Sequence, residues 1–195
     1  DGFFQTSYNS LYWSGDLKGL KIDSINVNTG VITTSQAWSA ALKLDALVSG
    51  TGWDTARKVV TLAPDNTGTL KGVPFRLANL SAAQKTALGS STEQAKVLSY
   101  LRGDTSNQST LTLRKSYRYR ASVLGDIVDS GALYVGPPGQ YYSDAYNPGY
   151  SAFKTSKASR KPVVYVGAND GMLHAFDGQL TASGGGELFA LVPNA

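Results

Sequence analysis

The last part of the chain alternates short apolar runs with turn-forming residues. An apolar run at 163–166 (Val-Val-Tyr-Val) is followed by Asn-Asp-Gly at 169–171. Asparagine and glycine tolerate the positive φ angles of a tight turn, so this sequence between two β-rich runs predicts a hairpin. The second strand is expected at 172–177 and, after a glycine-rich loop, a third at 187–192. Three short strands in such close succession predict one blade-like antiparallel meander.

The beginning of the chain shows the same order of features. Residues 12–23 read YWSGDLKGLKID, and residues 165–177 read YVGANDGMLHAFD. With a one-residue gap, four pairs of positions match: Tyr12 and Tyr165, Asp16 and Asp170, Leu20 and Leu173, Asp23 and Asp177. In both segments we expect an aromatic-rich strand, a Gly/Asp turn and a second strand that ends in aspartate. A degenerate internal repeat of this kind is typical of β-propeller blades.

More turns and strands are expected between these two segments. Asn-Thr-Gly at 28–30 predicts a hairpin turn. Trp38 follows this turn in a position that corresponds to Phe189 in the last predicted unit, so we expect both rings to pack between neighbouring blades. The pattern loosens from 43 to 52, before a strand predicted at 57–62. The turn predicted at 64–68 contains an Asp-Asn pair but lacks the alternating carboxylates and distal glutamate of an EF-hand loop, which favours a plain turn over a cation site.

One helical island interrupts the β-rich pattern, at about 79–104. Ser81 and Ser91 each stand three residues before a glutamine, which is the spacing of a capping box. The helices are expected over SAAQKTAL and STEQAKVLSYLR, and Gly103 is a fitting C-terminal stop for the second. Because this stretch is too short to have its own core, we predict an insertion in a blade rather than a separate domain.

The region after the island contains a tyrosine-rich loop. Basic residues and tyrosines at 114–120 predict an exposed strand or sheet edge, and 122–136 predicts two short strands about a Gly/Ser turn. The loop at 137–150 carries four tyrosines: Tyr141, Tyr142, Tyr146 and Tyr150. Tyrosine offers rigid amphipathic area, so they are candidates for a protein-binding surface, or alternatively they pin the loop to the body. A short helix is expected within 150–160.

Composition favours a β-rich, extracytoplasmic protein. Only 16% of the 195 residues are charged, well below the usual quarter, and glycine is abundant. The chain contains no cysteine, which excludes disulfides, thiolate metal sites and a cysteine nucleophile. No apolar run approaches the length of a membrane span. The sequence lacks an initiator methionine and both ends look cut, so we expect 1–195 to be a fragment of a longer chain.

The net charge of +4 is unevenly distributed. One basic cluster contains Arg114, Lys115, Arg118 and Arg120, and the other contains Lys154, Lys157, Arg160 and Lys161. A nucleic-acid-binding protein would gather such clusters on one face. Two solvated faces are the simpler interpretation, so no nucleic-acid partner is expected.

Catalytic motifs are absent from the sequence. His174 is the only histidine, which excludes a metal site with two histidines. A Ser-His-Asp triad would lack the G-x-S-x-G nucleophile elbow. His174 alternates with Leu173 and Ala175 in a predicted strand, and Asp170 lies in a predicted turn, so we interpret both as structural. Three glycines at 184–186 open no helix and therefore form no phosphate cradle. No catalytic residue, cofactor or metal site is expected here.

Three segments occur in order near the end of the chain: VLGDIVDSGALYVG at 123–136, RKPVVYVGANDGMLHAFDG at 160–178 and ELFALVP at 187–193, with YWSGDLKGLKID at 12–23 and YLRGDTS at 100–106 leading into them. These segments resemble the C-terminal region of the PilY/PilC family, the type IV pilus biogenesis factors and tip-associated adhesins of Gram-negative bacteria. The resemblance implies a mainly β fold, namely an incomplete portion of a modified β-propeller with the short helical insertion. The family's Ca²⁺-binding loop has no match here, so Ca²⁺ is expected only elsewhere in the full-length protein.

The resemblance further implies a non-enzymatic role in pilus assembly, in opposing retraction and in attachment to surfaces or host cells. Expected partners are pilins or minor pilins, the remainder of the propeller, and host or surface receptors. The expected location is the cell surface or pilus, with the outer membrane and periplasm in transit, and without membrane insertion. The sequence NDGMLHAFD also resembles the blade repeat of PQQ dehydrogenases, which makes a quinoprotein fragment the alternative. That class would need a Ca²⁺ site and a carboxylate base, which this sequence does not display.

Overall fold

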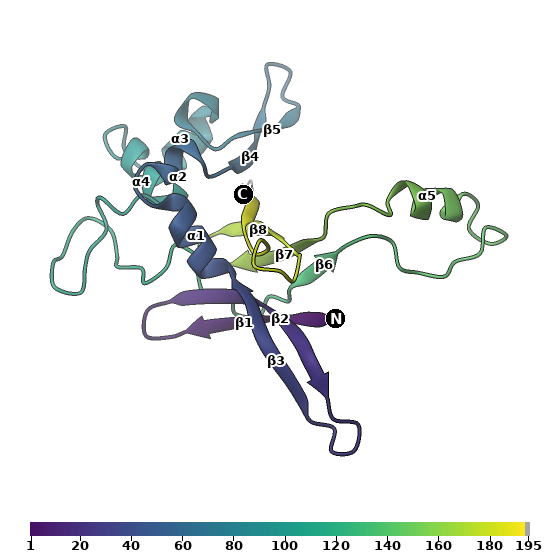
Figure 1. Ribbon diagram of the computed structural model, residues 1–195. Helices are drawn as coiled ribbons and strands as arrows, with labels where there is room; N and C mark the ends of the chain where they lie inside the picture. The colour runs from purple at the N-terminus through teal and green to yellow at the C-terminus, as the bar shows by residue number, and fades with distance from the viewer. Residues whose placement is uncertain (194–195) are drawn as a thin grey trace.

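The computed structural model describes residues 1–193, in which two β-sheets dominate (Figure 1). The first is an antiparallel sheet of β1 (Gly2–Asn9), β2 (Ser14–Ile25) and β3 (Ile32–Ser39) in that order. The second has the strand order β5-β4-β9-β8-β7-β6. Its strands are β4 (Val59–Pro64), β5 (Leu70–Pro74), β6 (Leu133–Val135), β7 (Val163–Ala168), β8 (Met172–Asp177) and β9 (Glu187–Val192). The domain bounds expected from the sequence include Asn194 and Ala195, which lie outside the described residues.

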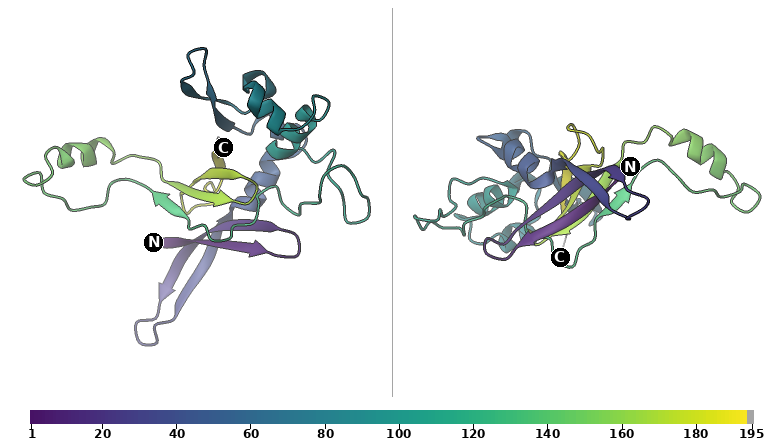
Figure 2. Two further views of the ribbon diagram at one scale, coloured as in Figure 1. Left: turned by 180° about the vertical axis from the view of Figure 1, so that it is seen from behind. Right: turned by 60° about the horizontal axis from the view of Figure 1, so that its bottom comes forward.

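Short helices gather at one end of the second sheet, and one more lies on a projecting segment (Figures 1 and 2). The helices are α1 (Ala40–Val48), α2 (Gly52–Thr55), the 3-10 helix η1 (Leu77–Asn79), α3 (Ala82–Ala87), α4 (Gln94–Arg102) and α5 (Tyr150–Ser156). Helices α2, α3 and α4 lie near β4 and β5, α1 runs from them to the first sheet, and α5 stands apart from both sheets. The short helix expected within 150–160 is thus confirmed as α5.

The predicted terminal meander is confirmed. Strands β7 and β8 pair antiparallel, with Ala168 opposite Met172 next to the turn, and β8 pairs antiparallel with β9. Gly171 in this turn has a φ of 85°, a backbone conformation that a residue with a side chain rarely adopts. Strand β6 adds to the other side of β7. The hairpin is predictable because its turn residues are local in the sequence.

Strand β4 extends this meander in a way that the sequence did not indicate. It pairs with β9 in parallel, with Val59 opposite Ala190. The Thr61 hydroxyl donates to the Val192 carbonyl oxygen at 2.9 Å, across 131 positions of sequence. This parallel pair joins the helix-containing part of the chain to the terminal strands.

The predicted alignment of the internal repeat is wrong. Tyr12 lies in the turn between β1 and β2, whereas Tyr165 lies inside β7. Asp16 lies inside β2 opposite Ser7, whereas Asp170 lies in a turn. The Asp16 carboxylate accepts from the Ser39 hydroxyl at 2.8 Å and so supports the start of α1. Both segments form hairpins, but these aligned residues lie in a strand in one hairpin and in the turn of the other.

Helix α1 occupies residues for which no regular element was expected. Its N-cap, Ser39, accepts a hydrogen bond from the Leu42 amide, as serine commonly does at this position. Ala40, Leu44 and Val48 are buried, and their spacing of four places them on one face of the helix. The pattern was expected to loosen from 43 to 52, and the helix was missed because its buried apolar stripe has only three members.

The two expected helices of the island form, with one difference. The capping box of Ser81 and Gln84 is present in α3, as predicted. The second predicted capping box, of Ser91 and Gln94, is wrong, because α4 begins after Glu93 rather than after Ser91. Gly103, with a φ of 118°, ends α4 as predicted. The island shares its core with the second sheet in a cluster made of Val59, Phe75, Leu80, Leu98, Met172 and Ala190.

Two other predicted strand regions are largely irregular. The segment 114–120 contains a single bridge, between Gln108 and Tyr117, and no strand. In 122–136 only β6 forms. Val123, Leu124 and Ile127 are nevertheless buried in the main core. Their segment meets the start of β2 at the Ser14–Gly125 bridge, where the Gly15 amide donates to the Leu124 carbonyl oxygen at 3.4 Å.

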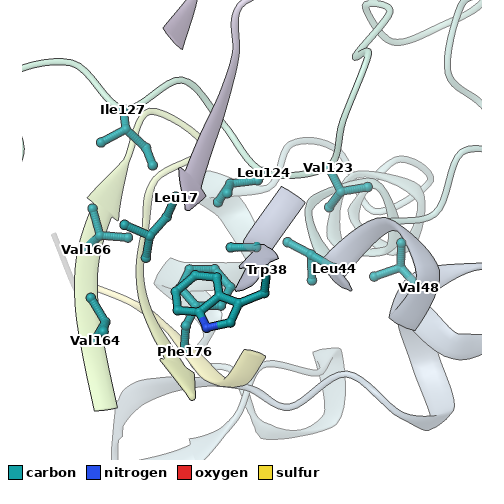
Figure 3. Packing of buried hydrophobic residues seen from close by; sticks show 11 residues of the cluster. Leu17, Trp38, Leu44, Val48, Val123, Leu124, Ile127, Val164, Val166 and Phe176 are labelled. Atoms are coloured by element: carbon teal, nitrogen blue, oxygen red, sulfur yellow. The ribbon is translucent and has the colours of Figure 1, made fainter. Parts of the chain in front are cut away.

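The main core lies between the two sheets and α1 (Figure 3). Trp38 lies among Leu17, Leu44 and Phe176 and is 2% exposed. Its ring centroid is 5.7 Å from that of Phe4, and its indole nitrogen donates to the Gln179 carbonyl oxygen at 2.7 Å. Trp38 therefore joins the first sheet to the loop before β9. The other predicted packing aromatic, Phe189, is only half-buried and lies beside Tyr165.

Candidate functional site

His174 is fully buried in β8, and carboxylates bind both of its ring nitrogens. Its Nδ1 lies 2.8 Å from Oε1 of Glu187, the first residue of β9. Its Nε2 lies 3.1 Å from each oxygen of Asp170, in the β7–β8 turn. Because a carboxylate only accepts hydrogen bonds, this geometry requires a proton on both nitrogens.

Glu187 is bound on its other side by Arg57, which lies between α2 and β4. Arg57 Nε donates to Oε2 at 2.8 Å and Nη2 to Oε1 at 3.0 Å, a bidentate pair. The two side chains are 0% and 1% exposed. Arg57, Glu187, His174 and Asp170 thus alternate in charge, and we call these four residues the buried ionic cluster.

Hydrogen bonds to the backbone complete the buried ionic cluster. Arg57 Nη1 donates to the Arg102 carbonyl oxygen at 2.9 Å, at the end of α4. Asp170 accepts from the amides of Gly125 and Met172, both at 3.1 Å. The cluster therefore links β8, β9, the chain before β4, the end of α4 and the irregular segment that contains Gly125.

The pKa values of the cluster follow from this geometry. Burial alone would lower the pKa of His174, but its hydrogen bonds to Asp170 and Glu187 and the charges of these residues raise it to about 9. Burial would raise the pKa of Glu187, but His174 and Arg57 hold it below its ordinary value. The pKa of Asp170 is lowered in the same way by His174 against the effect of burial. His174, Glu187 and Asp170 are therefore all charged at neutral pH.

This arrangement suits a structural role better than catalysis. A triad would need a hydroxyl or thiol nucleophile hydrogen-bonded to His174, and both of its nitrogens are bound to carboxylates. The imidazole is also buried, so a substrate could not exchange a proton with it. The sequence pointed to structural roles for His174 and Asp170, but the charged cluster was missed because Arg57 and Glu187 are 130 positions apart.

Alkaline pH is expected to loosen the strands around His174. The stability that comes from its protonated ring is fully present below its unfolded pKa of 6.5 and is lost as the pH rises through about 9. Hydrogen–deuterium exchange of β8 and β9, corrected for intrinsic exchange rates, should therefore accelerate between about pH 7 and pH 10. In His174→Asn the strands should be less protected throughout, and the part of the pH dependence due to the imidazole should vanish. Equal alkaline responses in both proteins would contradict this assignment.

The four predicted tyrosines lie on residues 137–161, which form a projecting segment that we call the arm (Figures 1 and 2). Tyr141 and Tyr146 are 96% and 89% exposed, and Tyr142 is also exposed. Tyr150 is half-buried, donates to the Gln140 carbonyl oxygen at 3.2 Å and meets the Tyr142 ring edge-on. The structure thus brings Tyr142 and Tyr150 together, and Tyr150 ties the arm to itself rather than to the sheets.

The two basic clusters differ in their surroundings. Arg120 of the first is half-buried, lies 3.7 Å from the Tyr100 ring centroid and donates to Gln108 at 2.9 Å. It therefore supports the loop after α4, and only its three neighbours are exposed. The second cluster lies on the arm and around its return to β7, close to the tyrosines.

The turn at 64–68 holds its carboxylate with hydrogen bonds from its own residues and with one lysine. The Asp65 carboxylate accepts from the amides of Thr67 and Thr69 and pairs with Lys71 at 2.7 Å, which is turn chemistry, as predicted. In residues 1–193, no group of three or more histidine, cysteine, aspartate or glutamate side chains could hold a metal ion. The helices of this described part are all too short or too polar to span a bilayer.

Comparison with known proteins adds a family match. Residues 124–195 match the family model described as "PilY1 beta-propeller domain", which supports the predicted propeller portion for the part of this mainly β chain that contains β6 to β9. A "Type IV pilus biogenesis factor PilY1 homolog" of Xylella fastidiosa is 39% identical over 196 residues, which cover 98% of this chain and 14% of that protein. The "Type IV pilus biogenesis factor PilY1" of Pseudomonas aeruginosa strain PAK is 34% identical over 206 residues, which cover 98% and 16%. The chain thus spans 14–16% of the length of these relatives. No solved structure matches the chain.

Proposed function

Because the chain belongs to the PilY/PilC family of type IV pilus biogenesis factors, we propose that it serves pilus biogenesis as part of the propeller region of a longer protein. The observation that carries this proposal is the 39% identity to the Xylella fastidiosa relative across 98% of the chain. The proposed role comprises support of pilus assembly, opposition to retraction, and attachment to surfaces or host cells. The proposed location is the cell surface or the pilus.

The proposed role is non-enzymatic. Its support is the buried ionic cluster, in which the only histidine is enclosed by two carboxylates and cannot reach a substrate. The alternative of a quinoprotein dehydrogenase is not favoured, because the relatives named above are pilus biogenesis factors.

The proposed partners are pilins or minor pilins, surface or host receptors, and the remainder of the propeller. Strands β1 and β3 end the first sheet, and β5 and β6 end the second, so each has an unpaired edge in the described part of the chain. Such edges pair readily with further strands, which neighbouring blades would supply. Tyr141, Tyr142, Tyr146 and Tyr150 are proposed as the surface that contacts another protein.

Deletion of the full-length gene tests this function in the bacterium. We expect few surface pili, weak attachment, and restoration of both by the wild-type gene. If the protein opposes retraction, removal of the retraction motor from the deletion strain should return pili to the surface without restoring attachment. Normal pilus numbers and attachment after deletion alone would contradict the proposal. Electron microscopy of pili and counts of attached cells are the measurements.

A further inference from the structure

The arm carries positive charge that the rest of the described structure does not neutralise. Asp144 is its only acidic residue, and its carboxylate already accepts from the Ser151 amide at 2.9 Å. Lys161 pairs with Asp177 of β8 at 2.9 Å. Lys154, Lys157 and Arg160 form no ion pair within residues 1–193. Three uncompensated cations therefore remain on this segment.

Two of these cations are held against aromatic rings of the arm. The Lys154 ammonium lies 4.7 Å from the Tyr141 ring centroid and donates to the Gln140 carbonyl oxygen at 3.3 Å. The Arg160 guanidinium lies 5.8 Å from the Phe153 centroid. A shallow pocket of about 450 Å³ opens beside the Phe153 ring and is lined by Tyr146, Asn147, Pro148, Gly149, Tyr150 and Phe153. The arm thus combines cations, aromatic rings and a shallow pocket.

We propose that this surface of the arm binds an acidic segment of a protein partner. The inference rests on the proposed function of the tyrosines as a binding surface and adds the chemistry of what they bind. Tyrosine and arginine are enriched where proteins bind one another, and complementary charge selects the partner. Single-stranded nucleic acid also binds cations beside aromatic rings, but it needs ring faces on which bases stack. The Tyr142 and Tyr150 rings meet at 70° with centroids 5.1 Å apart, an edge-on contact unlike a stacking platform.

The test uses the full-length protein and a short fluorescent peptide rich in aspartate and glutamate. Binding measured by anisotropy should weaken with added salt, and it should be absent for the matched peptide of asparagine and glutamine. The variant K154Q/K157Q/R160Q should bind the acidic peptide roughly tenfold more weakly, as expected from the loss of three exposed charge pairs. Tyr141→Ala/Tyr146→Ala should also bind more weakly, because the rings supply contact area. These side chains lie on the projecting arm, so the fold should be unaffected.

The first basic cluster provides a matched control. R114Q/K115Q/R118Q removes the same charge from exposed residues outside the arm and should leave peptide binding unchanged. Equal weakening by both triple variants would overturn the proposal, because net charge rather than the arm would then determine binding. Binding of a sulfated polysaccharide or single-stranded DNA through the arm, without binding of the acidic peptide, would also overturn it.

The same variants separate this inference from the proposed function. One outcome would be that K154Q/K157Q/R160Q restores normal piliation and attachment in the deletion strain while the tyrosine variant does not. This outcome would contradict the proposal of an acidic partner but would support the tyrosines as a binding surface. If deletion of the gene changes neither property, the proposed function itself fails, whatever the peptide does.

Discussion

Replacement of Arg57 by alanine is expected to lower the free energy of unfolding by about 3–5 kcal/mol. The reason is that Glu187 would remain charged inside the protein without the guanidinium that binds both of its oxygens. The Arg102 carbonyl oxygen would also lose its donor. Denaturant unfolding should show the loss, and hydrogen–deuterium exchange of the full-length protein should place it in β4, β8 and β9.

An exposed ion pair provides the control for this experiment. Lys71 pairs with Asp65 at 2.7 Å, but the Lys71 side chain is 64% exposed, and exposed pairs contribute little to stability. Lys71→Ala should therefore leave exchange in the strands unchanged. Arg57→Lys should fall between the wild type and Arg57→Ala, because an ammonium keeps the charge but not the bidentate geometry. A stable Arg57→Ala protein with unchanged exchange would show that the cluster is not needed to hold the strands together.

Trp38→Ala is expected to destabilise the protein by a similar amount, about 3–5 kcal/mol, because it removes a large side chain from the centre of the main core. The loss has two parts, the cavity left between the sheets and the hydrogen bond to the Gln179 carbonyl oxygen. Gly19 and Gly185 lie so close to the indole that a Cβ at either position would clash with it, so the surrounding backbone is shaped around this ring.

Two comparisons distinguish these parts. Trp38→Phe keeps most of the apolar contact and should cost less than Trp38→Ala, with exchange of the loop around Gln179 increased by the missing donor. Trp13→Ala changes a residue that is 60% exposed and should have little effect on unfolding. Equal stability of Trp38→Ala and Trp13→Ala in denaturant unfolding would contradict the placement of Trp38 in the core.

Features set by neighbouring residues were predictable from the sequence. The β7–β8 hairpin depends on an Asn-Asp-Gly turn, and the start of α3 depends on Ser81 and Gln84. In each case the interacting groups are a few residues apart, so the local sequence is sufficient to predict their geometry. The loop character of the arm and the exposure of Tyr141 follow from the same kind of local signal.

Features that depend on distant contacts were not predictable. Asp16 and Asp170 occupy matching positions in the two similar sequence segments. Asp16 nevertheless lies in a strand opposite Ser7, where its carboxylate accepts from Ser39 at the start of α1, and not in a turn. Leu124 looks like a strand residue but lies in no strand; it is buried in the main core, and its carbonyl oxygen accepts from the Gly15 amide at the start of β2. The burial of Arg57 depends on Glu187, and hydrophobic periodicity carries no information about a charge 130 positions away.

The parallel pairing of β4 with β9 also constrains the order in which the protein can fold. Val59 is synthesised long before Ala190, its partner across the pair, so this edge of β4 stays open while the intervening residues emerge. Contacts of such high sequence separation are slow to form, because the chain must first lose the entropy of a long loop. An unpaired β4 edge in a nascent chain is prone to wrong strand pairing. Truncation before β9 should therefore leave this region in an aggregation-prone state.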